Sequence, residues 1–266
     1  MYRLRLGKSI GFLKDSFYED LKEAKALGFD SLDFDLCGKW KQREEEIEGY
    51  RDLQRGLEAV KASGLYFNGV HVSFGPHWDF SSTDEAKRRE AIENFAGIAP
   101  LIDSYSPNCY IIHGSYEPIL TENRAAQIAA LKQSLSEMLG ITKTTVAVEI
   151  LPRTCLCNTA AEAIAIVDAM ASEQIRVCVD VNHFLQETSE EGVLALGDRI
   201  VTTHISDHDY INERHWMPRE GLINWNALLA AFEKIGYSGV FNYEVGESLA
   251  KVKANYDALF ADYNNR

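Results

Sequence analysis

The sequence predicts an α/β protein folded as a (β/α)8 TIM barrel, and three observations support this fold class. Strand-like and helix-like segments alternate from one end of the chain to the other. The length of 266 residues, with 46% hydrophobic and 25% charged, suits one large core. Acidic and histidine side chains interrupt the apolar strands near their C-terminal ends, where barrel enzymes carry their chemistry.

The first half of the chain alternates four expected strands with four expected helices. Short apolar runs predict the strands, and apolar residues three and four positions apart predict the helices. The strands are Leu4–Phe12, Phe29–Leu36, Leu65–Phe74 and Asn108–His113. The helices are Ser16–Leu27, with Ser16 as N-cap and Gly28 as stop, then Tyr50–Ser63, Asp84–Tyr105 and Glu122–Leu139, ended by Gly140. A polar insertion, Gly38–Gly49, and a loop, Gly75–Thr83, separate some of these elements.

The second half repeats the pattern. Its strands are Thr144–Ile150, Gln174–Val181, Arg199–Ile205 and Gly239–Val245. Its helices are Thr159–Ala171, capped by Asn158 or Thr159, then Ser189–Leu196, Trp225–Ile235 and Glu247–Tyr263, with a long loop at Ser206–Asn224. Eight such units without a linker predict a single domain over residues 1–266. A doubly wound sheet is the alternative, but it usually carries a G-x-G-x-x-G turn after its first strand, which is absent here.

The net charge indicates which partners to expect, and the cysteines indicate the redox compartment. The net charge is −13, from 27 Lys and Arg against 40 Asp and Glu, which argues against nucleic acid or an anionic membrane as partner. The five cysteines are odd in number and lack a framework spacing, so we expect reduced thiols and a cytoplasmic protein. Cys155-Leu-Cys157 is not a C-x-x-C motif and has a structural interpretation. We find neither a signal peptide nor a run of about 20 apolar residues.

The most informative stretch is Arg176–His183. Val177 and Val179 alternate with Cys178 and Asp180, as in a buried strand, and His183 follows three residues after Asp180. A carboxylate in so apolar a run is costly unless a partner compensates its charge. Oxygen and imidazole ligands together suit a divalent cation. The alternative is an Asp that caps a turn beside a surface His.

Other strands end in the same way. The residues concerned in six consecutive strands are His71, His113, Glu149, Asp180 with His183, His204 with Asp207, and Glu244. Alternation places Glu149 on the same face as the small Ala147, which suits a crowded barrel interior. Each residue alone could be structural: a core histidine, a glutamate paired with an arginine, or, for Asp207, a loop cap. The joint pattern predicts one shared polar site with a metal at the C-terminal face of the barrel.

The segments Val-Glu149-Ile, Val-Asp180-Val-Asn-His183, Thr-His204-Ile-Ser-Asp207 and Tyr-Glu244-Val resemble the xylose isomerase-like barrel superfamily. The resemblance covers essentially the whole chain, including the segment from His215 to Trp225. This group contains sugar isomerases and epimerases of the D-tagatose 3-epimerase and hydroxypyruvate isomerase type, inosose dehydratase and endonuclease IV. The resemblance implies that Glu149, Asp180, His204 and Glu244 hold one divalent metal, and that His183 and His215 line the substrate pocket.

From this resemblance and the strand ends we expect a metal-dependent isomerase or epimerase of a sugar or related small hydroxy-carbonyl compound. Glu149 and Glu244 would transfer protons through an enediolate. Expected substrate contacts come from His71, His113, His183, His215, Arg219, Trp40 and Trp78. Arg219 stands in Pro218-Arg219-Glu220-Gly221, where relatives often have Pro-Gly-x-Gly, so the turn there stays open. We expect Mn²⁺ first, with Zn²⁺, Co²⁺ and Mg²⁺ as alternatives. A homodimer or tetramer is compatible with the sequence.

Two other activities stay open at this point. One is a zinc phosphodiesterase similar to endonuclease IV, whose ligand types match here at His71, His113, Glu149, Asp180, His183, His204, His215 and Glu244. The ninth position has Glu213 instead of Asp, and the acidic chain shows no evident basic, aromatic-rich loop for DNA. The other is a dehydratase acting on an inosose-like cyclic ketone. Within the isomerase class, a hydride shift between adjacent carbons is the alternative to proton transfer.

Overall fold

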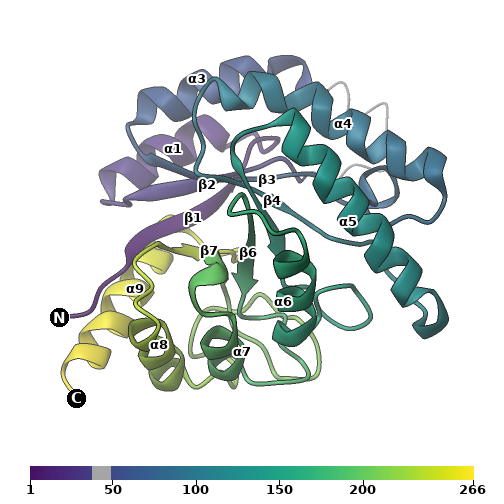
Figure 1. Ribbon diagram of the computed structural model, residues 1–266. Coiled ribbons are helices and arrows are strands. Elements are labelled where there is room, and N and C mark those ends of the chain that lie inside the picture. Colours follow the sequence, from purple (N-terminus) through teal and green to yellow (C-terminus); the bar gives the residue numbers. More distant parts are fainter. Residues whose placement is uncertain (38–48) are drawn as a thin grey trace.

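The protein is a closed barrel of parallel strands surrounded by helices, as the sequence predicts (Figure 1). The computed structural model describes residues 1–37 and 49–266. Neighbouring strands pair in chain order from β1 to β8, and β8 closes the barrel against β1 through pairs such as Lys8 with Tyr243. Most of the expected insertion Gly38–Gly49, with the pocket candidate Trp40, lies outside the described residues.

The strands begin and end close to the predicted positions. They are β1 Arg5–Gly11, β2 Ser31–Asp35, β3 Tyr66–His71, β4 Cys109–Ile112, β5 Thr145–Glu149, β6 Ile175–Asp180, β7 Ile200–Ile205 and β8 Val240–Tyr243. Each is short and almost completely buried, because helices cover the outer face of the sheet and the barrel interior covers the other. The predicted metal residues therefore lie at, or one residue from, a strand's C-terminal end.

The helices of the described part also follow the prediction. They are α1 Phe17–Ala26, α3 Leu53–Ser63, α4 Glu85–Asp103, α5 Arg124–Ile141, α6 Ala160–Ala169, α7 Ser189–Leu196, α8 Trp225–Lys234 and α9 Leu249–Asn264. Side-chain caps explain where five of the helices begin. In each, the N-cap side chain accepts a hydrogen bond from a backbone N–H of the first turn; these residues are Asp84, Thr159, Thr188, Asn224 and Ser248. Gly64 ends α3 in the left-handed conformation, with φ of 65°.

One predicted helix boundary is wrong, and one predicted cap residue makes no capping hydrogen bond. Ser16 stands at the N-cap position of α1, as predicted, but its hydroxyl donates to the Asp20 carboxylate instead of accepting from the backbone. Gly140 does not end α5, which continues to Ile141. A glycine near the end of a helix costs only about 1 kcal/mol, and the half-buried Ile141 packs against the core in return.

The hydrophobic core of the described residues has two parts. The larger part fills the space between the strands and the helices. The smaller part lies inside the barrel and consists of Cys109, Ile111, Ala147 and Cys178. Ala147 is therefore interior, as predicted, and Glu149 lies two residues further along the same face. Among the described helices, we find none with the length and apolar character needed to cross a bilayer.

Candidate metal centre

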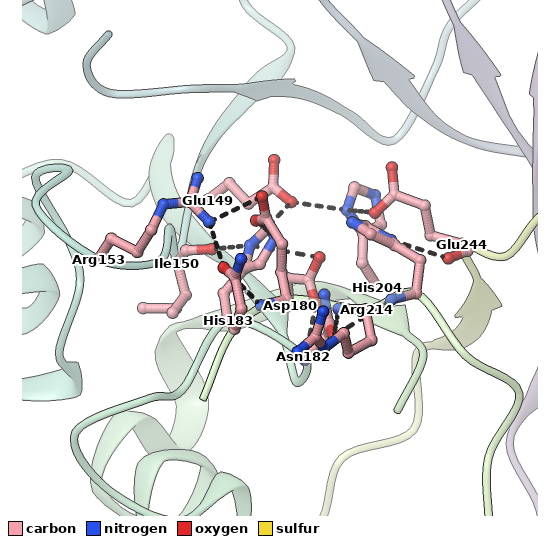
Figure 2. Close-up of polar contacts among 12 residues, drawn as sticks. Glu149, Ile150, Arg153, Asp180, Asn182, His183, His204, Arg214 and Glu244 are labelled. Carbon is pink, nitrogen blue, oxygen red and sulfur yellow. Dashed lines mark hydrogen bonds and ion pairs between the residues drawn. The ribbon is translucent and has the colours of Figure 1, made fainter. Parts of the chain in front are cut away.

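Four strand ends bring together the residues that we define as the inner cluster: Glu149, Asp180, His204 and Glu244. One ligand-type atom from each lies within 4.8 Å of the others. The pairing of β6 with β7 sets Asp180 beside His204 in register. Glu149 lies at the end of β5, and Glu244 directly follows β8. Figure 2 shows these four side chains converging from their strands. The arrangement is the one that the strand-end pattern predicts.

His204 links the two glutamates of the inner cluster. Its Nδ1 lies 2.9 Å from Glu149 Oε1 and 3.2 Å from Glu244 Oε2. Its other ring nitrogen, Nε2, lies 3.4 Å from Asp33 Oδ2, below the cluster in β2. A histidine ligand usually has a carboxylate at its second nitrogen, which fixes the ring. Asp33 lies at this position beside His204, although neither Asp33 Oδ2 nor His204 Nε2 has a hydrogen-bond partner among the described residues, and Nδ1 is directed into the cluster.

Glu149 is surrounded by imidazoles. Its Oε2 lies 3.2 Å from His71 Nε2 and 3.1 Å from His113 Nε2, while Oε1 faces His204. Only 1% of its side chain is exposed, compared with 25% for Glu244. The two glutamates therefore differ in accessibility: Glu149 is held from three sides, and Glu244 is open to solvent on one side.

Asp180 leaves one oxygen without a hydrogen bond. Its Oδ1 accepts from the backbone N–H of Asn182 at 2.8 Å. Its Oδ2 is buried and has no hydrogen-bond partner among the described residues. The nearby His183 Nδ1, at 3.3 Å, donates to the Ile150 carbonyl instead (Figure 2). An orphaned buried carboxylate oxygen is costly unless a cation or donor reaches it.

The charges of the inner cluster also call for a cation. Burial raises the pKa of Asp180 to about 6. Burial alone would raise the pKa of Glu149, but His204 and His113 outweigh it and lower that pKa well below its usual value. Burial alone would lower the pKa of His204, yet Glu244 and Glu149 raise it well above its usual value. Three carboxylates around one imidazole thus attract positive charge, and the donor set fits a divalent cation such as Mn²⁺ or Zn²⁺.

A second group, which we define as the outer cluster, consists of His183, Glu213 and His215. Its ligand-type atoms also lie within 4.8 Å of one another. Here an arginine already supplies positive charge, because Arg153 Nη1 lies 2.8 Å from Glu213 Oε1. Glu213 Oε2 lies 3.1 Å from His183 Nε2. The hydrogen bond from His183, together with Arg153, lowers the pKa of Glu213 to about 2 despite its partial burial.

Both clusters open into one cavity of about 250 Å³. Four of the predicted substrate residues line it: His71, His113, His183 and His215. Glu149 and Glu244 also line it, whereas Asp180 and His204 are completely buried beneath. Phe74 stacks on His113 with 4.4 Å between ring centroids, which gives the cavity an aromatic wall that the sequence does not single out.

The structure places two predicted substrate residues away from the cavity lining. Trp78 is buried in the hydrophobic core and packs edge-on against Phe80. Arg219 points to the surface, where its guanidinium lies 2.7 Å from Asp262. Its backbone N–H donates to Asp207, which also accepts from the Trp225 indole at 2.8 Å. Asp207 therefore organises the late loop, which is the structural alternative given for it.

Several functional neighbours were not predicted from the sequence. Asp33 supports His204 from below, and Asn182 accepts from the backbone N–H of Arg214 at 3.0 Å in the late loop (Figure 2). Arg153 balances the charge of the outer cluster. The alternation of Asp33 and Asp35 in an apolar strand was a usable signal, because both acids fall on one face. No comparable local signal marks Arg153, which contacts Glu213 only through the folded loops.

The chain matches the sequence model of the xylose isomerase-like TIM barrel family over residues 21–260. Because this match covers most of the chain, the protein belongs to that family, as the strand-end motifs indicate. A curated relative from Sinorhizobium fredii, the uncharacterized protein y4fM, is 32% identical over 78 residues. That alignment covers 28% of this chain and only 24% of the relative's length.

Solved structures with the same architecture include a D-tagatose 3-epimerase-like protein and the IOLI protein with a bound zinc atom. The first has a TM-score of 0.82 at 19% identity, over 98% of this chain and 99% of that chain. The second has a TM-score of 0.74 at 16% identity, over 98% of each chain. At such identities the likeness establishes the fold, and the chemistry has to be argued from the side chains.

Proposed function

We propose that this member of the xylose isomerase-like TIM barrel family is a divalent-metal-dependent isomerase or epimerase. Its substrate would be a sugar or a related small hydroxy-carbonyl compound. The observation that carries the proposal is the inner cluster, in which three carboxylates and one imidazole converge beside a cavity of about 250 Å³. This volume is slightly below the range of common drug-sized sites, so a small ligand fits it. Proteins with this fold include one described as D-tagatose 3-epimerase-like and one with a bound zinc atom, which supports this substrate class and a divalent metal.

Glu149, Asp180, His204 and Glu244 would hold the ion. When bound, a divalent cation supplies Lewis-acid polarisation of the substrate carbonyl and the neighbouring hydroxyl. Mixed carboxylate and imidazole ligands favour Mn²⁺, with Zn²⁺ or Co²⁺ as alternatives, over an all-oxygen magnesium site. His71, His113 and Asp33 orient these ligands through the contacts at Glu149 and His204.

The two glutamates would move the proton. One carboxylate removes the proton from the carbon beside the carbonyl, and the other returns a proton to the adjacent carbon or the opposite face of the same carbon. Glu244 is the more exposed of the two and lines the cavity, which suits the residue that exchanges its proton with solvent. His183 and His215 line the outer part of the same cavity and would hold substrate oxygens.

Hydrogen exchange with solvent tests the proposed mechanism. The metal-loaded protein is incubated with a panel of ketoses and aldoses in D₂O, and products are followed by NMR. We expect one substrate to isomerise with deuterium entering the carbon next to the carbonyl. Product formed without deuterium would replace the two-glutamate mechanism with a hydride shift. No isomerisation of any sugar or hydroxy-carbonyl compound would count against the proposed function itself.

The nuclease alternative is less well supported by the outer cluster. A multi-metal phosphodiesterase needs further cations close to the first. In this chain Arg153 lies against Glu213, the residue that such a cation would share with His183 and His215. A guanidinium in contact with this carboxylate opposes a second divalent charge at the same place.

A further inference from the structure

The ends of β2 and β3 bring a third group of ligand-type side chains together beside the cavity. Asp35 is the last residue of β2, His71 is the last of β3, and the two strands pair in register at these residues. Cys37 follows two residues after Asp35. One ligand-type atom from each of the three lies within 4.8 Å of the others. None of the three belongs to the inner cluster.

The distances suit a small metal site. Cys37 Sγ lies 3.0 Å from His71 Nδ1. In a tetrahedral zinc site with Zn–S of about 2.3 Å and Zn–N of about 2.1 Å, these two atoms are roughly 3.5 Å apart. The two side chains would therefore have to move apart by about half an ångström to admit the ion. Asp35 Oδ1 accepts from the Cys37 backbone N–H at 2.6 Å, which folds the segment so that the thiol faces His71.

The second nitrogen of His71 gives independent support. His71 Nε2 lies 3.2 Å from Glu149 Oε2, and only 3% of the side chain is exposed. Histidines that bind metals typically donate their other N–H to a carboxylate, which fixes both the tautomer and the ring. This contact leaves His71 Nδ1 directed at Cys37, and Nδ1 lies 3.0 Å both from Cys37 Sγ and from the Val72 carbonyl oxygen. Metal binding at Nδ1 would therefore replace the contact with that carbonyl.

We propose that Asp35, Cys37 and His71 form a second divalent-metal site, with one thiolate ligand and a preference for Zn²⁺ or Co²⁺. The described inner cluster contains no sulfur, so the two sites differ in chemical softness. A thiolate selects Zn²⁺ or Co²⁺ over Mn²⁺ and Mg²⁺. Cys37 and His71 line the cavity, so a fourth ligand, water or a substrate oxygen, would reach the ion from there. This proposal does not depend on the proposed function.

Metal binding at this site must displace a proton. Burial raises the pKa of the Cys37 thiol, so that without metal the thiol is protonated and hydrogen-bonded to His71 or to the Val72 carbonyl. Binding would release that proton to solvent as the thiolate forms. The competing account is that Cys37 only holds His71 in place, and the two accounts differ in a spectroscopic signature.

The experiment is a Co²⁺ titration of the full-length protein after removal of metals with a chelator. We expect a thiolate-to-cobalt charge-transfer band in the near ultraviolet, with an intensity that corresponds to one thiolate-bound Co²⁺ per chain once both sites are filled. Cys37→Ser should abolish this band, and Asp35→Asn, which keeps the side-chain shape, should raise the half-saturating Co²⁺ concentration at least ~10-fold. Cys155→Ser is the matched control, because Cys155 is a buried thiol that lines the same cavity, and it should keep the band.

Two further outcomes separate this site from the inner cluster. Asp180→Ala should keep the thiolate band, because Asp180 is not one of the three ligands. A wild-type protein without the band, or a band that persists in folded Cys37→Ser, overturns the second site. If the charge-transfer band is absent while the protein still turns over a sugar, the proposed function stands without the second site. If the band is present while no sugar is turned over, the second site stands without the proposed function.

Discussion

The inner and outer clusters open into the same cavity, but they balance their negative charge in different ways. In the inner cluster, no Arg or Lys of the described chain forms an ion pair with Glu149, Asp180 or Glu244. In the outer cluster, Arg153 contacts Glu213 directly. The spacing is similar in both clusters, but the inner one has three carboxylates and one imidazole, whereas the outer one has one carboxylate and two imidazoles. The comparison teaches that charge balance, more than the presence of ligands, indicates where this protein needs a divalent ion.

The largest expected effect comes from removing ligands of the inner cluster. The double variant Asp180→Ala/His204→Ala should lose turnover of the identified substrate by at least ~10³-fold, or about 4 kcal/mol of transition-state stabilisation. Glu213→Gln in the outer cluster is the matched change, and it should cost ~10-fold or less. Steady-state kinetics at saturating metal distinguishes the two. Equal losses of turnover in the two variants would mean that the inner cluster is no more important for catalysis than the outer one.

The inner cluster was largely predictable from the sequence. For the outer one, the resemblance singled out His183, Glu213 and His215, but nothing in the sequence indicated the contact of Glu213 with Arg153. Glu149 and Asp180 end their strands and His204 lies one residue before the end of its strand, and the alternating apolar residues fix which face each side chain occupies. A closed parallel barrel then brings these ends together. Arg153 and Glu213 lie in separate loops, and Arg153 has a positive φ of 51°. Such loop contacts depend on tertiary packing. Loops lack the two-residue alternation that shows, in a strand, which way each side chain points.

The two expected substrate residues that lie outside the cavity lining show the same limit. Arg219 and Trp78 belong to loop or short helical segments, and their residue types suited a sugar pocket. The fold instead pairs Arg219 with Asp262 on the surface and buries Trp78 among core side chains. Residue type therefore indicated which chemistry was available, and only strand register indicated where it would be.

The second prediction separates proton transfer from metal binding inside the inner cluster. Glu244→Gln keeps an oxygen ligand and a similar shape but cannot accept a proton, so turnover should fall by at least ~10²-fold while some metal binding remains. Deuterium exchange into the substrate should stop. Glu149→Gln should stop the exchange or change the labelled face. Full exchange in both variants would remove the glutamates from the proton-transfer step.

A third and smaller effect is expected from the outer cluster. Arg153→Met removes the cation that contacts Glu213, so the group His183, Glu213 and His215 should bind Zn²⁺ at least ~10-fold more tightly than in the parent. The titration is made in the Cys37→Ser/Asp180→Ala/His204→Ala background, so that neither the thiolate site nor the inner cluster contributes. An unchanged isotherm would mean that charge balance does not decide metal binding in this cluster.

The smallest effect is expected on nucleic acid. The protein should neither cleave abasic-site DNA nor bind it appreciably at physiological salt, because the net charge is −13 and Arg153 lies against Glu213. Incubation of an abasic duplex with Zn²⁺-loaded protein checks this. Cleavage that rises with both enzyme and zinc would support the phosphodiesterase and count against the isomerase.

The central claim is that the inner cluster holds one divalent ion, and Mn²⁺ binding tests it most directly. Mn²⁺ is a poor match for the thiolate of Cys37, so it reports mainly on the carboxylate-rich cluster. Equilibrium dialysis of chelator-treated protein against Mn²⁺ should give about one ion per chain for wild type and for Cys37→Ser. The Asp180→Ala/His204→Ala variant should bind none at the same concentration. If that folded double variant holds Mn²⁺ as tightly as wild type, the inner cluster is not the metal centre.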